Sequence, residues 1–402
     1  MNIAIKKIFG EYFFFVFIAI SLLAVLFLDI KLGMLFSIYM FLFLMKNGRI
    51  YIKIAKDDIF IYLFLIWSMI SVIWYESSNY LLFVYSFMSS YLPACFYFYA
   101  KYREDVELEK IRRNIFLGIK LSMIIGVVLY AIHPEFYGQF LLARDMIPAN
   151  NTYQIQKQFQ GVLGVTATAS FCAFLCLYEL NLMLQNKRNN YLILSGSIIL
   201  LLMTARKSAL IMLIVMVIVI VLKDIIVNMG IRKNVLFSFF IMVLVIAVSA
   251  IALPEQFAFL GERFQLLAFS SGMVDRQQLS DLAFRNLDNI YIGMGLGTAG
   301  HRAAVENTLS TIAVVIFDNS YYLMICEIGL VGVILFLVAV GNKLLVGMKR
   351  KMLMIEWQIV VIIMFQAITS NMFESIYVMP LFWYCLGVCA NKKIIKEGYI
   401  DV

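Results

Sequence analysis

The sequence predicts an all-α, polytopic integral membrane protein. Of its 402 residues, 63% are hydrophobic and only 14% are charged, and the mean hydropathy is +0.90. Soluble domains are about 45–50% apolar and about 25% charged, so this composition excludes a soluble globular chain. A membrane span takes roughly 20 apolar residues. The length therefore allows about 12 transmembrane helices, which we expect to form a single transmembrane domain over residues 1–402.

Twelve apolar runs provide these spans. A segment inside the bilayer must satisfy its backbone hydrogen bonds internally, so each run is predicted to be a helix. The strict alternation and shorter length of β-barrel strands are not found. The runs cover about 11–28, 32–45, 59–75, 80–99, 114–132, 161–180, 190–204, 208–222, 234–252, 319–341, 357–373 and 376–390.

The basic residues predict the orientation of the helices. With the N-terminus in the cytoplasm, 23 of the 33 Lys and Arg residues fall in inside segments, as the positive-inside rule requires. Both termini are then cytoplasmic. Two connections are long, about 133–160 and about 253–318, and both lie outside. Loops of this length are usually functional, so we expect the two external loops to carry the activity.

Charge, cysteine and histidine usage exclude several other functions. The net charge of +8 is an orientation signal in a membrane protein, so we expect the lipid bilayer and no nucleic acid as a partner. All six cysteines lie in apolar runs, and the chain has only two histidines. The sequence therefore predicts no disulfide framework, no metal site and no cofactor.

Arginine is frequent among the external basic residues, whereas the inside segments contain mostly lysine. Its planar guanidinium binds phosphate bidentately and keeps its charge when partly buried. An external, lipid-linked pyrophosphate would explain this choice, and ion pairing with the acids of the second loop is the alternative. The external arginines are Arg144, Arg206, Arg263, Arg276, Arg285 and Arg302.

Arg206 and Lys207 are the strongest candidates for binding an anion. They lie in the turn LLMTARKSALIML between two apolar runs, and ionisable groups at that depth normally face a cavity or a partner. The alternative for Lys207 is snorkelling to the interface. Arg276 has no acidic residue three or four positions away, which leaves it available for a ligand. Arg263 follows Glu262 and suits either role.

The stretch VDRQQLSDLAFRNLDN reads as an amphipathic helix with Leu287 on its buried side. Within it, Arg285 lies near Asp281 and Asp288, so local pairing can account for this arginine. Downstream, the glycine-rich run GMGLGTAGHR ends in His301 and Arg302. Because no strand precedes these glycines and no Lys-Ser/Thr follows them, flexible loop backbone is a better interpretation than a nucleotide site.

Acidic residues near the predicted tenth span are candidates for proton transfer. Asp318 and Asn319 lie at its outer start, where they suit either a helix N-cap or, for Asp318, uptake of a proton from a hydroxyl group. Glu327 lies about two turns deeper and is either functional or a protonated structural group. Near the inner ends of other spans, Lys120 and Glu179 are expected to snorkel.

Several motifs in order resemble the bacterial O-antigen polymerase and O-antigen ligase superfamily. They are FQGVLGVTATASF, then TARKSALIMLIV, then an arginine, a short helix and Gly-x-Gly-x-Gly, and finally Asp-Asn-Ser-Tyr-Tyr with Glu-x-Gly-Leu-x-Gly nine residues on. The resemblance covers about residues 159–340. It implies transfer of a glycan from undecaprenyl pyrophosphate on the periplasmic side of the bacterial inner membrane, without a metal or a nucleotide sugar.

By this resemblance, Arg206 and Arg276 hold the donor pyrophosphate. The family usually has an arginine where this chain has Gln158 and Gln160, which leaves Arg144 or Lys157 as substitutes. The external Lys207, Arg263, Arg285 and Asn319 are further substrate-binding candidates.

Ligases have His-Asn where this chain has Asp318-Asn319, so Asp318 or His301 would activate the acceptor hydroxyl. This departure favours a polymerase, which joins the growing glycan to the next lipid-linked repeat unit. Its partners would then be lipid-linked donor and acceptor, a chain-length regulator and a flippase. The alternatives are a ligase that transfers glycan to lipid A core, and a lipid-linked oligosaccharide flippase or transporter.

Overall fold

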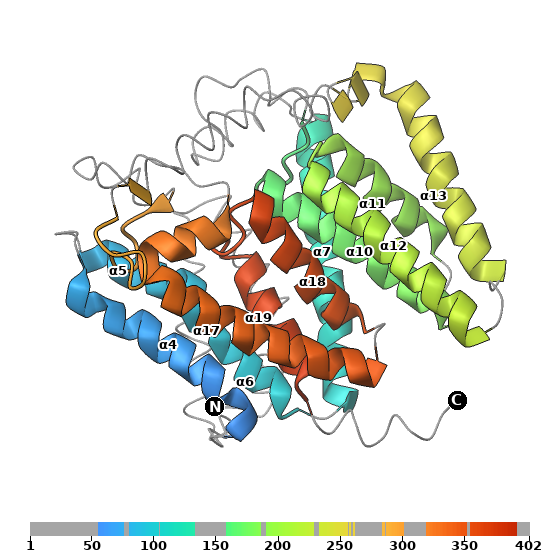
Figure 1. The fold of residues 1–402 in the computed structure, drawn as a ribbon. Coiled ribbons are helices and arrows are strands. Elements are labelled where there is room, and N and C mark those ends of the chain that lie inside the picture. The colour runs from blue at the N-terminus through green and yellow to red at the C-terminus, as the bar shows by residue number, and fades with distance from the viewer. Residues whose placement is uncertain are drawn as a thin grey trace, which may run out of the picture. The chain divides into compact units, whose positions relative to one another are not determined.

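A computed structural model describes residues 55–75, 80–103, 105–132, 158–185, 190–228, 233–255, 257–258, 260–261, 284–285, 287–300, 319–351 and 354–391. The regular elements in these ranges are helical (Figure 1). They form two compact units. Unit 1 comprises Met1–Leu32, Glu109–Phe269 and Leu353–Ile362, and unit 2 comprises Gly33–Leu108, Ser270–Met352 and Ile363–Val402. The single domain over 1–402 stays a prediction.

Within the described residues, five helical segments are long and apolar enough to cross a membrane: Lys56–Trp74, Tyr80–Lys101, Glu107–Ile132, Val165–Leu184 and Ser320–Met348. Shorter apolar helices cover Tyr191–Met203, Lys207–Leu222, Leu236–Ala252, Ile355–Thr369 and Val378–Cys389. These ten segments match the last ten predicted runs, and the runs at 11–28 and 32–45 lie outside the described residues. The helical class is confirmed, and the apolar helices are compatible with a membrane protein. The number of spans and their orientation stay predictions.

Unit 1 is built around α10 (Val165–Leu184), which is buried along almost its whole length. It packs against α11 (Tyr191–Met203), α12 (Lys207–Asn228) and α13 (Lys233–Ala252). The part of α7 (Asp105–Ile132) after Leu108 also belongs to this unit, and the Phe116 ring of α7 stacks on Tyr178 of α10 at 3.8 Å between centroids. A helix that is hydrophobic on all sides belongs at the centre of a bundle, and α10 takes that place.

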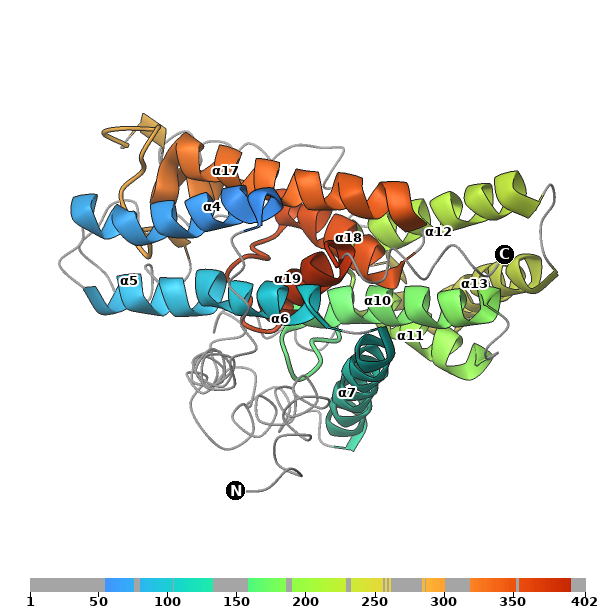
Figure 2. The same cartoon turned by 90° about the horizontal axis from the view of Figure 1, so that it is seen from below.

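Unit 2 is built from two neighbouring helix pairs. α4 (Ile59–Ile70) lies along α17 (Ser320–Lys351), and α6 (Cys95–Lys101) lies along α19 (Val378–Cys389), as both views show (Figures 1 and 2). The second pair approaches closely because α19 has Gly387 at the crossing. A Cβ atom there would lie 3.0 Å from the carbonyl carbon of Tyr97.

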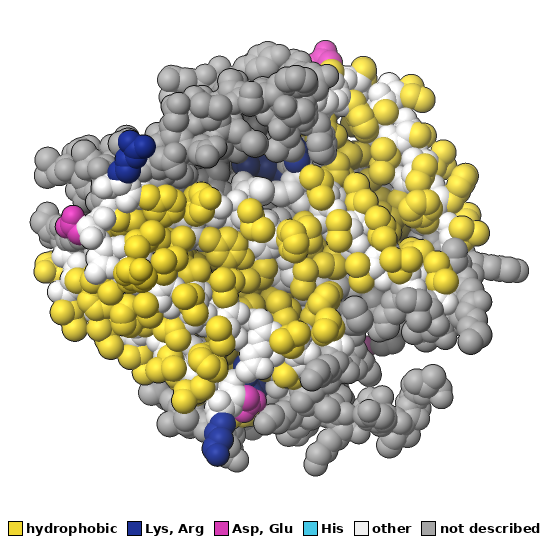
Figure 3. All heavy atoms as spheres, in the orientation of Figure 1, with side chains coloured by type: hydrophobic (Ala, Val, Ile, Leu, Met, Phe, Trp, Pro, Cys, Tyr) yellow, Lys and Arg dark blue, Asp and Glu magenta, His cyan; other side chains and the backbone are white. Residues whose placement is uncertain are grey.

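The outer faces of these helices are apolar, as a lipid environment demands. On α4, Leu63 and Ile66 are exposed, and on α17 so are Ile334 and Leu337. Figure 3 shows apolar side chains over these two helices. Soluble proteins rarely expose apolar patches of this extent, so this surface supports the assignment as a membrane protein.

Two membrane helices of unit 2 are interrupted. α17 contains a break at Gly329, whose φ of 69° and ψ of 178° are not helical. The segment that begins with α5 (Tyr80–Ser86) continues as a π-helix (Phe87–Tyr91) and a 3₁₀-helix (Leu92–Ala94) before α6. Pro93 lies in the 3₁₀-turn and cannot donate a backbone hydrogen bond. Such interruptions occur often at functional sites.

Candidate functional site

In unit 1, the turn between α11 and α12 presents Arg206 and Lys207 at a helix start. Ala205 holds a left-handed φ of 49°, which reverses the chain. The carbonyl of Arg206 accepts the N–H of Leu210, so Arg206 is the N-cap residue and Lys207 begins α12. Both cations are half-buried. The sequence prediction of two cations in a turn between two helices is therefore confirmed.

The loop at residues 158–164 packs against the end of α11, directly before this turn. Phe159 donates its N–H to the carbonyl of Met203 at 2.9 Å, and the Gln158 amide donates to the carbonyl of Thr204. These two carbonyls belong to the end of α11, where carbonyl groups lack partners within the helix. The first two motifs of the resemblance are thus in direct contact. Gln158, one of the two glutamines where the resemblance leads us to expect an arginine, caps the end of α11.

Close packing holds this loop in place. Gly161 has a φ of 60°, and a Cβ atom on it would lie 2.8 Å from Cγ2 of Thr168. The Thr168 hydroxyl donates to the carbonyl of Gln160 at 2.8 Å. Gly126 of α7 lets the loop approach, because its own Cβ would lie 3.2 Å from the Cα of Gly161. The loop that binds the end of α11 is therefore itself held by close contacts with α7 and α10.

The electrostatics of this turn favour an anion. The N–H groups of a helix's first turn have no acceptor within the helix, and the helix dipole places positive potential there. In α12 this end coincides with a guanidinium and an ammonium group, and its first turn contains no acidic residue. Phosphate groups bind well to such helix starts.

In unit 2, a second loop docks in the break of α17. Met294 and Gly295 donate their N–H groups to the carbonyls of Cys326 and Glu327, both at 2.8 Å. On the far side of the break, Leu330 donates to the carbonyl of Ile290 at 2.9 Å. We call residues 289–300 the glycine loop. It satisfies the backbone groups that the break releases, as a membrane environment requires.

The glycines of this loop are required by close contact, so the interpretation as flexible backbone was wrong. Residues 293–300 are buried. A Cβ on Gly293 would lie 2.7 Å from the carbonyl carbon of Glu327, and one on Gly297 would lie 2.5 Å from the carbonyl oxygen of Leu82. Both residues also have a positive φ. This part of the predicted external loop at 253–318 is therefore packed against a membrane helix.

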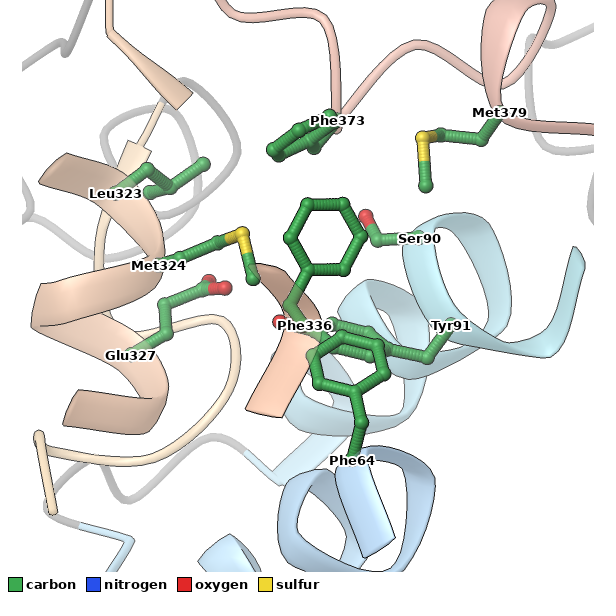
Figure 4. A pocket seen from close by; sticks show the side chains of 9 residues that line it. All are labelled: Phe64, Ser90, Tyr91, Leu323, Met324, Glu327, Phe336, Phe373 and Met379. Atoms are coloured by element: carbon green, nitrogen blue, oxygen red, sulfur yellow. The ribbon is translucent and has the colours of Figure 1, made fainter. Parts of the chain in front are cut away.

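Glu327 lies at the centre of this arrangement and is only 3% exposed. Its Oε1 accepts the N–H of Gly297 at 2.7 Å and the hydroxyl of Ser86 at 3.4 Å. Figure 4 shows the carboxylate reaching from α17 toward Phe336 in a cavity with about 310 Å³ of empty space, its open side included. The cavity is lined by Phe64, Ser90, Tyr91, Leu323, Met324, Glu327, Phe336, Phe373 and Met379.

The end of the glycine loop meets a second carboxylate. A Cβ on Gly300 would lie 2.5 Å from Oε1 of Glu374, whose other oxygen accepts a hydrogen bond from the Asn371 amide. Glu374 therefore lies beside the residue that precedes His301 in the chain. This contact could not be predicted from the sequence, because Gly300 and Glu374 are 74 residues apart in the chain.

The other candidate residues fall into two groups. Asn319 caps α17, since its Oδ1 accepts the N–H groups of Tyr321 at 2.9 Å and Tyr322 at 3.3 Å. Arg285 is exposed and forms no ion pair with Asp288, the one of its two expected partners that the structure describes. Leu287 lies on a buried side, as predicted, and packs on a cluster formed by Met294, Ala299, Leu323 and Cys326. Outside the described residues lie Arg144, Arg263, Arg276, His301 and Asp318.

Buried ion pairs correct the expectation of snorkelling. In unit 1, Lys120 pairs with Glu179 at 2.5 Å, and the Glu179 side chain is fully buried. Arg112 pairs with Glu356 at 2.5 Å. A buried carboxylate needs such a partner to stay charged, so Lys120 turns toward the protein.

A compact charge cluster in unit 2 was not predicted. Asp58 accepts hydrogen bonds from the Tyr97 hydroxyl at 2.5 Å, from Lys343 at 2.9 Å and from Lys101. Both lysines are among the 23 basic residues that the predicted orientation placed in inside segments. They lie in α17 and α6, where Lys343 is 2% and Lys101 is 4% exposed. Just beyond α6, burial and then the nearby Asp58 raise the pKa of Tyr102 to about 12.

Comparison with known proteins gave no match, neither to a family model nor to a curated protein or a solved structure.

Proposed function

We propose that this protein is a polysaccharide polymerase of the O-antigen type. It transfers the growing glycan from undecaprenyl pyrophosphate to the next lipid-linked repeat unit on the periplasmic face of the bacterial inner membrane. One observation carries the proposal: Arg206 and Lys207 lie at the start of α12, and the loop at residues 158–164 binds the end of α11 just before them.

This turn suits the donor substrate. A diphosphate carries adjacent negative charges, which a guanidinium fork, an ammonium group and a helix start can bind together. The turn lies in an apolar helix hairpin, so a polyprenol tail would remain in lipid while the diphosphate reaches the two cations. The same groups would stabilise the charge on the departing diphosphate during transfer.

The acceptor half of the reaction needs a proton acceptor. In the proposed mechanism a sugar hydroxyl of the acceptor attacks the anomeric carbon of the donor, and the bond to the diphosphate breaks. Asp318 or His301 takes the hydroxyl proton. Attack from the face opposite the diphosphate inverts the anomeric configuration.

A second candidate is a lipid-linked oligosaccharide flippase or transporter. The interruption of α17 at Gly329 and the π-helix at Phe87–Tyr91 favour it, because transporters form substrate sites from discontinuous helices. The glycine loop occupies the first interruption, and at the second the rings of Tyr91 and Phe64 pack beside the cavity with 5.4 Å between their centroids. We therefore rank this function below the polymerase.

The phenotype of a deletion strain separates the candidate functions. Loss of a polymerase leaves glycans of a single repeat unit. Loss of a ligase accumulates full-length glycan on the lipid carrier, and loss of a flippase leaves repeat units on the cytoplasmic face. Single-unit glycans support the proposal, and either of the other two products contradicts it.

Substitution of Arg206 tests the donor site in the same strain. Removing one group that stabilises charge in the transition state typically slows catalysis by about 100-fold or more, so Arg206→Ala should give mostly single-unit glycans. Arg206→Lys keeps the charge without the fork and should give chains of intermediate length. Arg113→Ala is the matched control, because Arg113 is an exposed arginine of α7 in the same unit. Normal chains from Arg206→Ala would refute the donor site.

A further inference from the structure

The glycine loop fills the break of α17 through hydrogen bonds to backbone carbonyls, with one exception. Met294 and Gly295 bind the carbonyls of Cys326 and Glu327. Trp67 donates its indole N–H to the carbonyl of Ile328 at 2.8 Å, and Trp74 donates to the carbonyl of Ile292 at 3.1 Å. The N–H of Gly297 instead points at a side chain, the carboxylate of Glu327.

A buried carboxylate is an energetically unfavourable hydrogen-bond acceptor. An ionised group loses its hydration when it is buried, and Glu327 is 3% exposed. Its Oε1 accepts from two donors, the N–H of Gly297 and the hydroxyl of Ser86. These donors come from the glycine loop and from α5, so one oxygen joins three segments of unit 2.

We propose that Glu327 is a positioning residue that locks the glycine loop into the break of α17. Its acceptor oxygen fixes Gly297, and the loop then brings Gly300 against the carboxylate of Glu374. Because the chain continues from Gly300 to His301, the lock sets where the following segment starts. Its effect on glycan length rests on the proposed function, whereas the docking of the loop does not.

A native cysteine reports whether the loop is docked. Cys326 is fully buried in a cluster with Met294, Ala299 and Leu323, the first two of which belong to the glycine loop. Release of the loop would uncover its thiol. The rate at which N-ethylmaleimide modifies Cys326 in the purified full-length protein, read by peptide mass spectrometry, therefore measures loop release. Cys385 and Cys389 of α19 are buried elsewhere and serve as internal references.

Four variants separate the possible roles of Glu327. Glu327→Gln keeps an acceptor oxygen, so Cys326 should stay protected and long glycans should still form. Glu327→Leu removes the acceptor, and local opening should speed labelling of Cys326 by about tenfold or more. Gly297→Ala should do the same, because its Cβ would lie 2.5 Å from the carbonyl oxygen of Leu82. Gly341→Ala in α17, the helix that contains Glu327, is the matched control, because a Cβ on Gly341 meets nothing within 4 Å.

Two results would overturn the proposal. One is labelling of Cys326 in Glu327→Leu as slow as in the wild type, because the loop would then dock without the carboxylate. The other is a Glu327→Gln protein that keeps Cys326 protected and makes no long glycan, because Glu327 would then act by taking a proton. A deletion strain with normal glycans would contradict the proposed function alone, and the labelling pattern would still decide the docking.

Discussion

Each of the two docked loops of this protein donates hydrogen bonds to carbonyl groups of a neighbouring helix, but the charged side chains beside the two loops have opposite signs. At residues 158–164 in unit 1, the loop binds the carbonyl end of α11 next to the cations Arg206 and Lys207. In unit 2, the glycine loop binds the carbonyls of a broken helix next to the carboxylate of Glu327. Both loops supply backbone donors where a membrane helix has unpaired carbonyls. The charged side chains beside the loops have different uses. Arg206 and Lys207 suit an anionic ligand, whereas Glu327 binds the loop itself.

The two places where the loops dock also differ in what prevents a larger residue from replacing a glycine. Gly329 lies so close to the glycine loop that an added Cβ would overlap the carbonyl group of Tyr291, which is backbone. In unit 1, the Cβ of a residue at Gly161 would instead overlap the side chain of Thr168. A side chain can be shortened by mutation and a backbone carbonyl cannot. The two loops should therefore respond differently to the same substitution.

The largest effect on stability is expected for Gly329→Ala. Its φ of 69° and ψ of 178° lie in a region that is essentially restricted to glycine, and such strain together with the overlap should cost at least about 3 kcal/mol. We expect a clear drop in the melting temperature of the detergent-purified protein. Gly341→Ala in the same helix should melt at the wild-type temperature or slightly above. An unchanged melting temperature for Gly329→Ala would show that the loop does not dock in the break.

A smaller and reversible effect is expected for Gly161→Ala. The φ of 60° is accessible to alanine only with strain, and the contact with Thr168 adds to it, so we expect a loss of about 2 kcal/mol. The double variant Gly161→Ala/Thr168→Ala should recover about half of this loss, because it removes the contact and also the hydrogen bond to Gln160. Thermal melting of the two single variants and the double variant measures the coupling. Strictly additive losses would mean that the two residues do not touch.

The sequence predicted the helices and the position of Arg206 well, because both depend on local patterns. Apolar runs of about 20 residues identify membrane helices directly, and the turn TARKSA contains its two cations within a few residues. The pairing of Asp58 with Lys101 and Lys343 joins positions up to 285 residues apart. No local pattern reveals such contacts, so this cluster could not be predicted from the sequence.

The glycine loop shows a different limit of sequence analysis. Four glycines in eight residues suggest flexibility when they are considered alone. Their real cause is the close approach of another backbone, and this becomes visible only when Gly329 and Glu327 are placed beside them. Lys120 and Glu179 were misjudged for a related reason, since each was considered singly and the two form one ion pair.

The most direct test of the account is binding of the lipid diphosphate at Arg206. Native mass spectrometry of the purified protein with undecaprenyl diphosphate would compare the wild type, Arg206→Ala and the control Arg113→Ala. Loss of a charge-assisted contact to phosphate should weaken binding by about tenfold or more, so we predict a clear loss of the bound lipid in Arg206→Ala and none in Arg113→Ala. Equal occupancy in all three proteins would contradict the claim that this turn holds the donor.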